Sequence, residues 1–324
     1  MPRALITGIT GQDGSYLTDL LLEKGYEVHG IVRPANVLER SRIAHLYQNS
    51  EIYNRRLFLH RSDLTDPPGL QRIVQETAPD ELYHLAGQSH VGLSFDMAET
   101  TCELTGLGTV RLLEMARKLP KPPRFFNASS SEIFGSPETS PQDERTPFRP
   151  VTPYGCAKAF ATQMVGIYRQ SLGLFGCNAM LYNHESPRRG ETFVPQKICR
   201  AAAAIKEGRQ TELLLGNLAS KRDWGDARDY VRAMWMMLQH DTPGDYVIAT
   251  GELHSVQELV ELAFGAVGLD WQKYVKQDPR FMRPGDPVRL VGNPAKAKQV
   301  LNWQPTTPFS QFIPEMTRAG LQKP

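Results

Sequence analysis

Short apolar or β-branched segments alternate with helix-like stretches over the first half of the chain, and this pattern limits the fold more than any other feature. The strand-like segments are residues 4–7, 27–32, 57–60, 81–86, 124–129 and 178–183. Helix-like stretches between them include residues 14–24, 68–76 and 104–118. Strands that alternate with helices form a parallel sheet through right-handed crossovers, with helices on both faces. We therefore predict an α/β fold with a doubly wound parallel sheet, whose ligand lies beyond the C-terminal ends of the strands.

The alternation changes in the second half of the chain. From about residue 185 it gives way to mixed segments with many arginines and prolines, although residues 245–251 look like one further strand. A chain of 324 residues, 40% of them hydrophobic, can bury a large core. We predict that residues 1–184 form the sheet domain, that residues 226–251 return to it, and that residues 185–324 mainly form a smaller substrate-binding domain.

Composition excludes several classes of protein. The net charge of +2 gives no general attraction to nucleic acid or to membranes. Nowhere do about 18 apolar residues run together, as a membrane span would require. The start of the chain, MPRALITG, has no basic leader, and the four cysteines form no C-x-x-C pair. We expect a cytoplasmic protein that holds no metal and no disulfide.

Three glycines separate the first strand from the first helix in the segment LITGITGQDGSYL. Gly8, Gly11 and Gly14 permit a tight turn and let backbone N–H groups and a helix N-terminus approach a pyrophosphate. The spacing differs by one residue from the commonest dinucleotide fingerprint, but the position at the first strand–helix junction fits it. This segment predicts a Rossmann-type domain that binds a dinucleotide cofactor.

The end of the second strand distinguishes NADP from NAD. An acidic residue there would bind the adenosine ribose, whereas this strand ends with Arg33, and Arg40 and Arg42 follow. A guanidinium suits a 2′-phosphate, so we favour NADP over the alternative of a solvated basic loop. Asp63 and Leu64 follow the third strand and could lie against the adenine, although Asp63 could equally cap a turn.

A helix is predicted to begin after Thr152, with Pro153 in its first turn, and to end at Gly173. Tyr154 and Lys158 lie one turn apart on its surface. An ammonium favours the phenolate, so we expect Lys158 to lower the pKa of Tyr154 and let it take a proton from a sugar hydroxyl. Such a pair is common by chance, and its position after a dinucleotide loop and five strands is what favours a catalytic role.

The segment NASSSEIFG, residues 127–135, has two interpretations. Ser129 followed three residues later by Glu132 is the pattern of a helix capping box. The segment also ends the fifth strand at the expected ligand edge, where Glu132 could be a catalytic base. We favour the second interpretation because of that position.

These motifs resemble the extended short-chain dehydrogenase/reductase family, and within it the GDP-mannose 4,6-dehydratases. The resemblance covers nearly the whole chain, and NHESPRRGE and KRDWG are its most specific motifs. The segments that carry it are GITGQDGSYL, LLLEKGYEVHGI, AGQSHVGLSF, SSSEIFG, NHESPRRGE, LGNLASKRDWGDARDYV and NPAKAKQVLNW.

The resemblance implies a reaction in which NADP takes a hydride from C4 of the sugar and returns it to C6. Tyr154, helped by Lys158, would remove the C4 hydroxyl proton, and Glu132 would take the C5 hydrogen as the C6 hydroxyl leaves as water. Ser130 takes the place of a catalytic threonine. Ser131 stands where relatives acting on dTDP-glucose carry an aspartate, which favours the GDP-mannose branch.

The resemblance also assigns binding residues. The cofactor set is Gly8, Thr10, Gly11, Gln12, Asp13, Gly14, Arg33, Asp63, Leu64, Leu85, Ala86, Gly87, Gln88, Ser89, Tyr154, Lys158, His184 and Arg189. The substrate set is Ser89, Ser94, Asn183, Lys197, Arg222, Arg283 and Asp286. A buried structural imidazole at His184 and solvated surface cations at the basic positions are the alternatives.

Pro195, Gln196 and Asp286 depart from the usual pattern of these dehydratases. They leave open a 4,6-dehydratase or epimerase-type enzyme acting on another GDP sugar, such as a heptose. A non-catalytic dinucleotide-binding protein is a further alternative. The resemblance also implies a homodimer or homotetramer, formed through helices that include the one carrying Tyr154.

Overall fold

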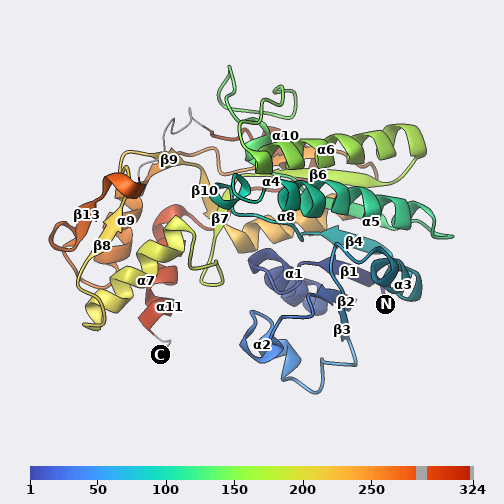
Figure 1. Ribbon diagram of the computed structural model, residues 1–324, viewed down its shortest axis with the longest axis horizontal. Coiled ribbons are helices and arrows are strands. Elements are labelled where there is room, and N and C mark those ends of the chain that lie inside the picture. The colour runs from blue at the N-terminus through green and yellow to red at the C-terminus, as the bar shows by residue number, and fades with distance from the viewer. Residues whose placement is uncertain (282–289, 322–324) are drawn as a thin grey trace.

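A seven-stranded sheet forms the centre of the larger part of the molecule (Figure 1). The computed structural model describes residues 1–281 and 290–321. Every neighbouring pair in the sheet is parallel, and the strand order is β11-β6-β5-β4-β1-β2-β3. The strands are β1 (Arg3–Thr7), β2 (Glu27–Val32), β3 (Leu57–Arg61), β4 (Glu81–His84), β5 (Arg124–Ala128), β6 (Gly176–Leu181) and β11 (Asp245–Ile248). The predicted doubly wound α/β fold is confirmed.

Helices cover both faces of this sheet. Ala4 and Ile6 of β1 point into one apolar core together with residues of α1 (Gln12–Glu23), α8 (Ala227–Gln239) and α10 (Ala295–Leu301). Leu5, between them, points into a second core on the other face, which α3 (Pro67–Thr77), α5 (Gly108–Arg117) and α6 (Pro153–Leu172) complete. A parallel sheet needs this two-sided cover, and it explains why its strands are apolar at successive positions.

Two predicted elements differ from the structure. The stretch expected as one strand over 178–183 divides, because β6 ends at Leu181 and β7 (Asn183–Glu185) pairs instead with β10 (Trp224–Asp226). The helix expected over 104–118 begins as a π-helical segment, η3 (Cys102–Leu107), and becomes α5 only at Gly108. A single-sequence pattern does not show which strand a segment will pair with, since pairing partners lie far away in the chain.

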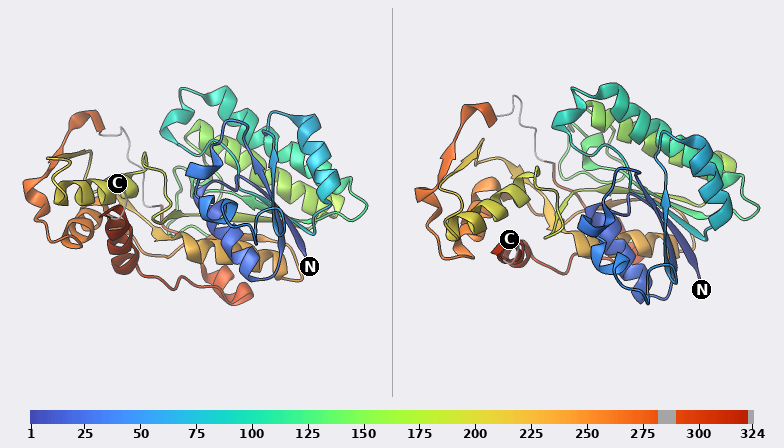
Figure 2. Two further views of the ribbon diagram at one scale, coloured as in Figure 1. Left: turned by 90° about the horizontal axis from the view of Figure 1, so that it is seen from below. Right: turned by 60° about the horizontal axis from the view of Figure 1, so that its bottom comes forward.

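A second, smaller core lies beside the sheet, and its helices gather at the left of Figure 1. It is built by α7 (Val194–Lys206), α9 (Val256–Gly265) and α11 (Phe309–Leu321). Two short sheets flank it: β13 (Val275–Gln277) pairs with β8 (Leu213–Leu215), and β12 (His254–Ser255) pairs with β9 (Lys221–Arg222). The chain passes between the two cores more than once, since α8, β11 and α10 belong with the sheet (Figure 2). The exact domain boundaries stay a prediction.

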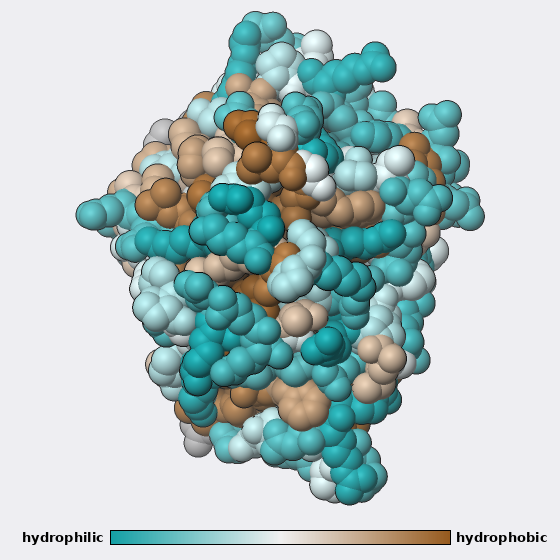
Figure 3. Space-filling view, turned by 90° about the vertical axis from the view of Figure 1, so that its right-hand side faces the viewer, coloured by the Kyte–Doolittle hydropathy of each residue, from teal (hydrophilic) through white to brown (hydrophobic). Residues whose placement is uncertain are grey.

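The remaining elements are short. They are η1 (Leu38–Arg40), α2 (Ala44–Tyr47), η2 (Gly92–Ser94), α4 (Ala98–Thr101), η4 (Ser131–Ile133), η5 (Trp271–Lys273) and η6 (Pro279–Phe281). The face in Figure 3 is mainly hydrophilic, with apolar side chains in several separate places. None of the helices in residues 1–281 and 290–321 combines the length and apolar content that a membrane span needs.

Candidate functional site

The glycine loop between β1 and α1 packs so closely against the end of β4 that side chains are excluded. Gly8 has φ of +76°, and a Cβ there would lie 2.9 Å from the backbone N of Ala86. A Cβ on Gly14 would lie 2.3 Å from the carbonyl oxygen of Gly8. Gly11 begins α1 without any side-chain cap, so the first N–H groups of the helix are left for a ligand. This cradle fits a dinucleotide pyrophosphate.

The end of β4 lies beside this loop at the topological switch point, where the strand order reverses between β1 and β4. The N–H groups of Leu85 and Ala86 each donate to the Thr7 hydroxyl at 3.2 Å, which ties the two strand ends together. Gly87, Gln88 and Ser89 follow directly along the chain. The predicted cofactor residues of the two loops therefore meet at one edge of the sheet.

Asp13 and His184 form a pair across the glycine loop, although they come from distant parts of the chain. His184 Nε2 lies 2.9 Å from Asp13 Oδ2, and its Nδ1 lies 2.8 Å from the carbonyl oxygen of Tyr182. Burial opposes charge on the imidazole, but the Asp13 carboxylate outweighs it and raises the pKa of His184 above its ordinary value. Burial likewise opposes charge on Asp13, yet His184 holds the pKa of that carboxyl below its usual value. Gln12 joins them by donating to the carbonyl oxygen of His184 at 3.1 Å.

The basic residues after β2 take two different positions. Arg33 is exposed at the end of the strand. Arg42 reaches back to the glycine loop, where its Nη1 donates to the carbonyl oxygen of Thr10 at 3.2 Å and its Nε donates to that of Arg188. A guanidinium therefore lies directly beside the loop that would hold the cofactor.

Three other predicted binding residues have local hydrogen bonds. Asp63 accepts from the N–H of Thr65 at 3.0 Å and from its hydroxyl at 2.9 Å, which is the turn-capping geometry considered for it. Gln88 both donates to and accepts from the backbone of His90. Ser94 is fully buried, and its hydroxyl donates to a backbone carbonyl. The side chain of Ser94 therefore acts within its own turn.

The capping-box interpretation of NASSSEIFG does not match the structure. Ser129 Oγ lies 2.6 Å from Thr162 Oγ1 on α6, so it does not cap a helix. Ser130 is the N-cap of η4 instead, and its hydroxyl accepts from the N–H of Glu132 at 3.2 Å. The Glu132 side chain is half-buried.

Helix α6 has the predicted boundaries. Thr152 is its N-cap and accepts from the N–H of Gly155 at 2.9 Å, while Gly173 ends it with φ of +69°. A Cβ on Gly155 would lie 2.6 Å from the carbonyl oxygen of Glu132. The start of α6, which carries Tyr154, is thus pressed against the segment that carries Glu132.

Tyr154 and Lys158 are both buried, and burial dominates their protonation. Burial raises the pKa of Tyr154 to about 12, and the charge of Glu132 raises it further. A hydrogen bond from Ser130 and the charge of Arg189 lower the same pKa. Burial lowers the pKa of Lys158 to about 8, which Asp13 opposes. The expected lowering of the tyrosine pKa by Lys158 is not observed: Lys158 Nζ donates to the carbonyl oxygen of Ala128 at 2.5 Å and lies 5.8 Å from the centroid of the Tyr154 ring.

The predicted substrate residues spread over β7, α7 and β9. Asn183 begins β7, beside the site. Lys197 on α7 donates to the carbonyl oxygen of Leu214 at 2.9 Å, and burial lowers its pKa. Arg222 lies in β9, opposite His254 of β12. Ser89 and Ser94 follow β4, and the last two predicted residues, Arg283 and Asp286, lie outside the described residues.

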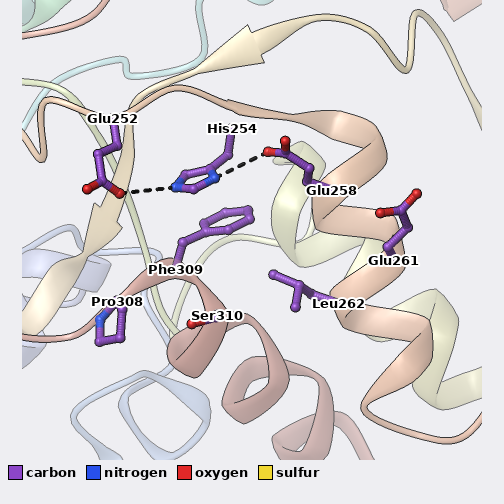
Figure 4. Close-up of a pocket in the computed structure, with 8 residues that line it drawn as sticks. All are labelled: Glu252, His254, Glu258, Glu261, Leu262, Pro308, Phe309 and Ser310. Carbon is purple, nitrogen blue, oxygen red and sulfur yellow. Dashed lines mark hydrogen bonds and ion pairs between the residues drawn. The ribbon is translucent and has the colours of Figure 1, made fainter.

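An open pocket of about 420 Å³ lies at the surface beside the smaller core, between α9 and the start of α11 (Figure 4). His254 stacks on Phe309 with ring centroids 4.0 Å apart and planes 4° apart. Its nitrogens lie 3.2 Å from Glu258 and 3.7 Å from Glu252. Because His254 pairs with Arg222 across β12 and β9, we interpret this group as packing that holds the strand of Arg222 in place.

Sequence reasoning missed several residues around the site. Glu185 is buried within NHESPRRGE, and its Oε2 lies 3.2 Å from Arg189 Nε. Phe193 packs on the same arginine, with Cζ 3.7 Å from the ring centroid. Asp223 accepts four hydrogen bonds from the segments at residues 250, 251 and 292. For Glu185 and Asp223, membership of the specific motifs NHESPRRGE and KRDWG was the only available signal, and Phe193 had none. In residues 1–281 and 290–321, no group of three His, Cys, Asp or Glu side chains could hold a metal ion.

Several solved structures share this fold along nearly the whole chain. A UDP-glucose 4-epimerase from Thermus thermophilus, in complex with NAD, has a TM-score of 0.84, with 27% identity and 99% of both chains covered. RMD from Pseudomonas aeruginosa, in complex with NADPH, has a TM-score of 0.83 and 24% identity over 99% of both chains. DesIV, a dTDP-glucose 4,6-dehydratase from Streptomyces venezuelae with NAD and TYD bound, has a TM-score of 0.85 and 23% identity, with 98% of this chain and 96% of that chain covered. The last two show the fold alone.

Sequence relatives are much more similar. GDP-mannose 4,6 dehydratase 2 of Arabidopsis thaliana is 48% identical over 324 residues, covering 98% of this chain and 87% of its own. The Yersinia enterocolitica and Homo sapiens GDP-mannose 4,6-dehydratases are each 47% identical, covering 100% and 98% of this chain and 95% and 91% of their own. The family model described as GDP-mannose 4,6 dehydratase matches residues 5–316. The chain therefore belongs to the GDP-mannose 4,6-dehydratase family, within the short-chain dehydrogenase/reductase fold.

Proposed function

We propose that this protein dehydrates GDP-mannose to GDP-4-keto-6-deoxymannose with NADP as its cofactor. Membership of the family supports the substrate, and the glycine cradle supports a nicotinamide dinucleotide. The observation that carries the proposal is the contact of the Glu132 segment with the start of the Tyr154 helix, close enough for the charge of Glu132 to raise the pKa of Tyr154. A dehydratase needs a carboxylate near that tyrosine to take the C5 proton, whereas a plain reductase does not.

Each catalytic residue would have one task. Tyr154 would take the proton of the C4 hydroxyl as the phenolate, a form that burial disfavours and that the Ser130 hydrogen bond and the charge of Arg189 favour. The Ser130 hydroxyl would hydrogen-bond the C4 oxygen. The bound nicotinamide would supply hydride chemistry, accepting from C4 and giving back at C6. Glu132 would take the C5 proton, made acidic by the C4 ketone, and return it to C5 as hydride adds at C6. The C6 hydroxyl would leave as water with the proton that Tyr154 took from the C4 hydroxyl. Lys158 is positively charged below its pKa of about 8, and its hydrogen bond to the carbonyl oxygen of Ala128 would hold the Tyr154 helix against the end of β5.

NADP is proposed over NAD because of the cations around the glycine loop. No acid ends β2, Arg33 is exposed there, and Arg42 is bonded to the carbonyl oxygen of Thr10. Guanidinium groups recognise a 2′-phosphate through charge-assisted hydrogen bonds. Titration of the protein with each dinucleotide tests this part, and tighter binding of NAD than of NADP would contradict it.

A related GDP sugar, such as a heptose, is the second candidate. Pro195 and Gln196 lie in the first turn of α7, next to Lys197, where the resemblance leads us to expect threonine and arginine. Gln196 is almost fully buried, and its Oε1 has no hydrogen-bond partner in the described part of the chain. Both departures lie beside a predicted substrate residue, so they bear on which GDP sugar is bound.

The decisive experiment is incubation with GDP-mannose and catalytic NADP, with mass spectrometry to detect loss of water. Glu132→Gln should abolish water loss while circular dichroism stays unchanged, because the amide cannot accept the C5 proton. Dehydration that survives this change would show that another group is the base. Turnover of a GDP heptose but not GDP-mannose would favour the second candidate.

We also propose that the protein is a homo-oligomer that associates through α6. Phe160, Ile167 and Leu172 on this helix are exposed, as is Leu107 on the neighbouring η3. Sedimentation that shows a monomer at working concentrations would overturn this.

A further inference from the structure

Arg189 lies between two partners that nothing in the proposed mechanism uses. Its Nε is 3.2 Å from Oε2 of Glu185, a side chain that is almost fully buried. The approach does not have hydrogen-bond geometry, since both atoms lack a hydrogen-bond partner in the described residues. On its flat face the guanidinium meets the ring of Phe193, 3.7 Å from the centroid. The Glu185 carboxylate keeps the charged guanidinium at this place, and the Phe193 ring fixes the plane of the guanidinium.

Phe193 also connects the two parts of the molecule. It is the N-cap of α7, and its carbonyl oxygen accepts from the N–H of Lys197 at 2.9 Å. Its ring lies 5.7 Å from that of His90, which follows β4 at the edge of the central sheet. The Phe193 ring is therefore placed between the cofactor edge of the sheet and the helix that carries Lys197.

The charge of Arg189 acts on the reacting centre. It lowers the pKa of Tyr154, against Glu132 and Asp13, which raise it; the largest effect on that pKa is burial. It also lowers the pKa of Asp13 in the glycine loop. Besides these groups, Ser130 hydrogen-bonds Tyr154 and Lys158 lies 5.8 Å from its ring. A small displacement of the guanidinium would change the balance of these charges.

We propose that Phe193 is a positioning residue, whose ring holds the Arg189 guanidinium in place beside Tyr154 and the glycine loop and joins it to α7. This inference rests on the proposed function for the role of Tyr154, but not for the packing of Arg189 on the ring. Removing the aromatic face frees the guanidinium to turn toward solvent, whereas another aromatic ring would keep it. The predicted outcome is a graded effect on cofactor affinity and on the pH profile.

The test compares Phe193→Leu with Phe193→Tyr. A cation–π contact contributes about 1 kcal/mol, so Phe193→Leu should weaken NADPH binding about fivefold in a fluorescence titration. In dehydration assays the rising limb of kcat/KM against pH should move to higher pH, since Tyr154 then loses part of a neighbouring positive charge. Phe193→Tyr should keep both values close to wild type.

A matched control is available away from the site. Arg124 lies over the ring of Phe175, 4.5 Å from its centroid, at the start of β6. Phe175→Leu removes the same kind of contact and should leave NADPH affinity and the pH profile unchanged. If Phe193→Leu does not fold, Phe193→Met replaces it, because a thioether chain fills the space without offering an aromatic face and should weaken NADPH binding likewise.

Two results would overturn the proposal: wild-type NADPH affinity and pH profile in Phe193→Leu, or equal losses in the leucine and tyrosine variants. The arms also separate this proposal from the proposed function. A wild-type protein that binds NADPH but does not dehydrate GDP-mannose refutes the function, while the NADPH affinities of the variants still decide the role of Phe193.

Discussion

Replacing Gly8 by alanine should damage both the stability and the cofactor site, and Gly25 provides a matched control. The two glycines have similar backbone conformations, with φ of +76° and +83°. A Cβ on Gly25 would meet nothing within 4 Å, whereas one on Gly8 would lie 2.9 Å from Ala86 N and 3.1 Å from the carbonyl carbon of Leu85. Gly25→Ala therefore measures the backbone strain alone, and Gly8→Ala measures strain together with close approach.

The expected magnitudes follow from these contacts. Left-handed backbone strain on an alanine costs about 1 kcal/mol, which both variants share. At Gly8 the new methyl group meets backbone atoms that cannot rotate away, and forced overpacking of this kind costs about 1–3 kcal/mol more. We expect Gly25→Ala to lose about 1 kcal/mol of unfolding free energy and Gly8→Ala about 2–4 kcal/mol.

The assay is urea unfolding of both variants, combined with a fluorescence titration with NADPH. Gly8→Ala should also bind NADPH much more weakly, because separating β1 from β4 moves the N–H groups that Thr7 now holds. Gly25→Ala should bind it like the wild type. Equal stability losses, or unchanged binding by Gly8→Ala, would refute the argument that close backbone approach forms the cradle.

Two further predictions concern buried carboxylates. The lowered pKa of Asp13 stabilises the fold above pH 3.8, the ordinary pKa of the group, and this stabilisation is lost as the pH falls through the lowered pKa. The raised pKa of His184 stabilises the fold fully below pH 6.5, and this stabilisation is lost as the pH rises through the raised pKa. The difference in Tm between wild type and Asp13→Asn should therefore be largest near about pH 5 and shrink above neutrality; a difference that is constant with pH would contradict this. Asp223→Asn should lose at least about 2 kcal/mol in urea unfolding, because an amide NH2 cannot accept from the N–H groups of both Gly251 and Gly292. An unchanged unfolding midpoint would show that this carboxylate does not tie the segments together.

Local signals in the sequence predicted the elements that local interactions decide. Thr152, Pro153 and Gly173 bound α6 as expected, because an N-cap hydroxyl, a proline in the first turn and a left-handed glycine act within a few residues. The alternation of strands and helices along the chain predicted the parallel sheet, because strands joined through helices pair in parallel. The position of the glycine loop after the first strand predicted that the loop lies at the C-terminal edge of the sheet, where it packs against the end of β4.

Protonation and pairing were decided by the tertiary structure. The sequence leads us to expect a lowered pKa at Tyr154, but burial raises it, and burial depends on packing from the whole chain. The capping box that the spacing of Ser129 and Glu132 suggested does not form, because the Ser129 hydroxyl lies 2.6 Å from that of Thr162 on α6. Spacing alone does not show which side chains a folded chain withdraws from water.

The sequence by itself determined the family and the sheet architecture, and it predicts which side chains react, since these depend on short motifs and periodic patterns. Only the tertiary structure brought Asp13 to His184 and placed Phe193 between Arg189 and His90. The physical reason is that the strength of a charge depends on its distance from other groups and on its exposure to water. The distances between these groups and their exposure to water are fixed only when β4, β7 and α7 pack around the site.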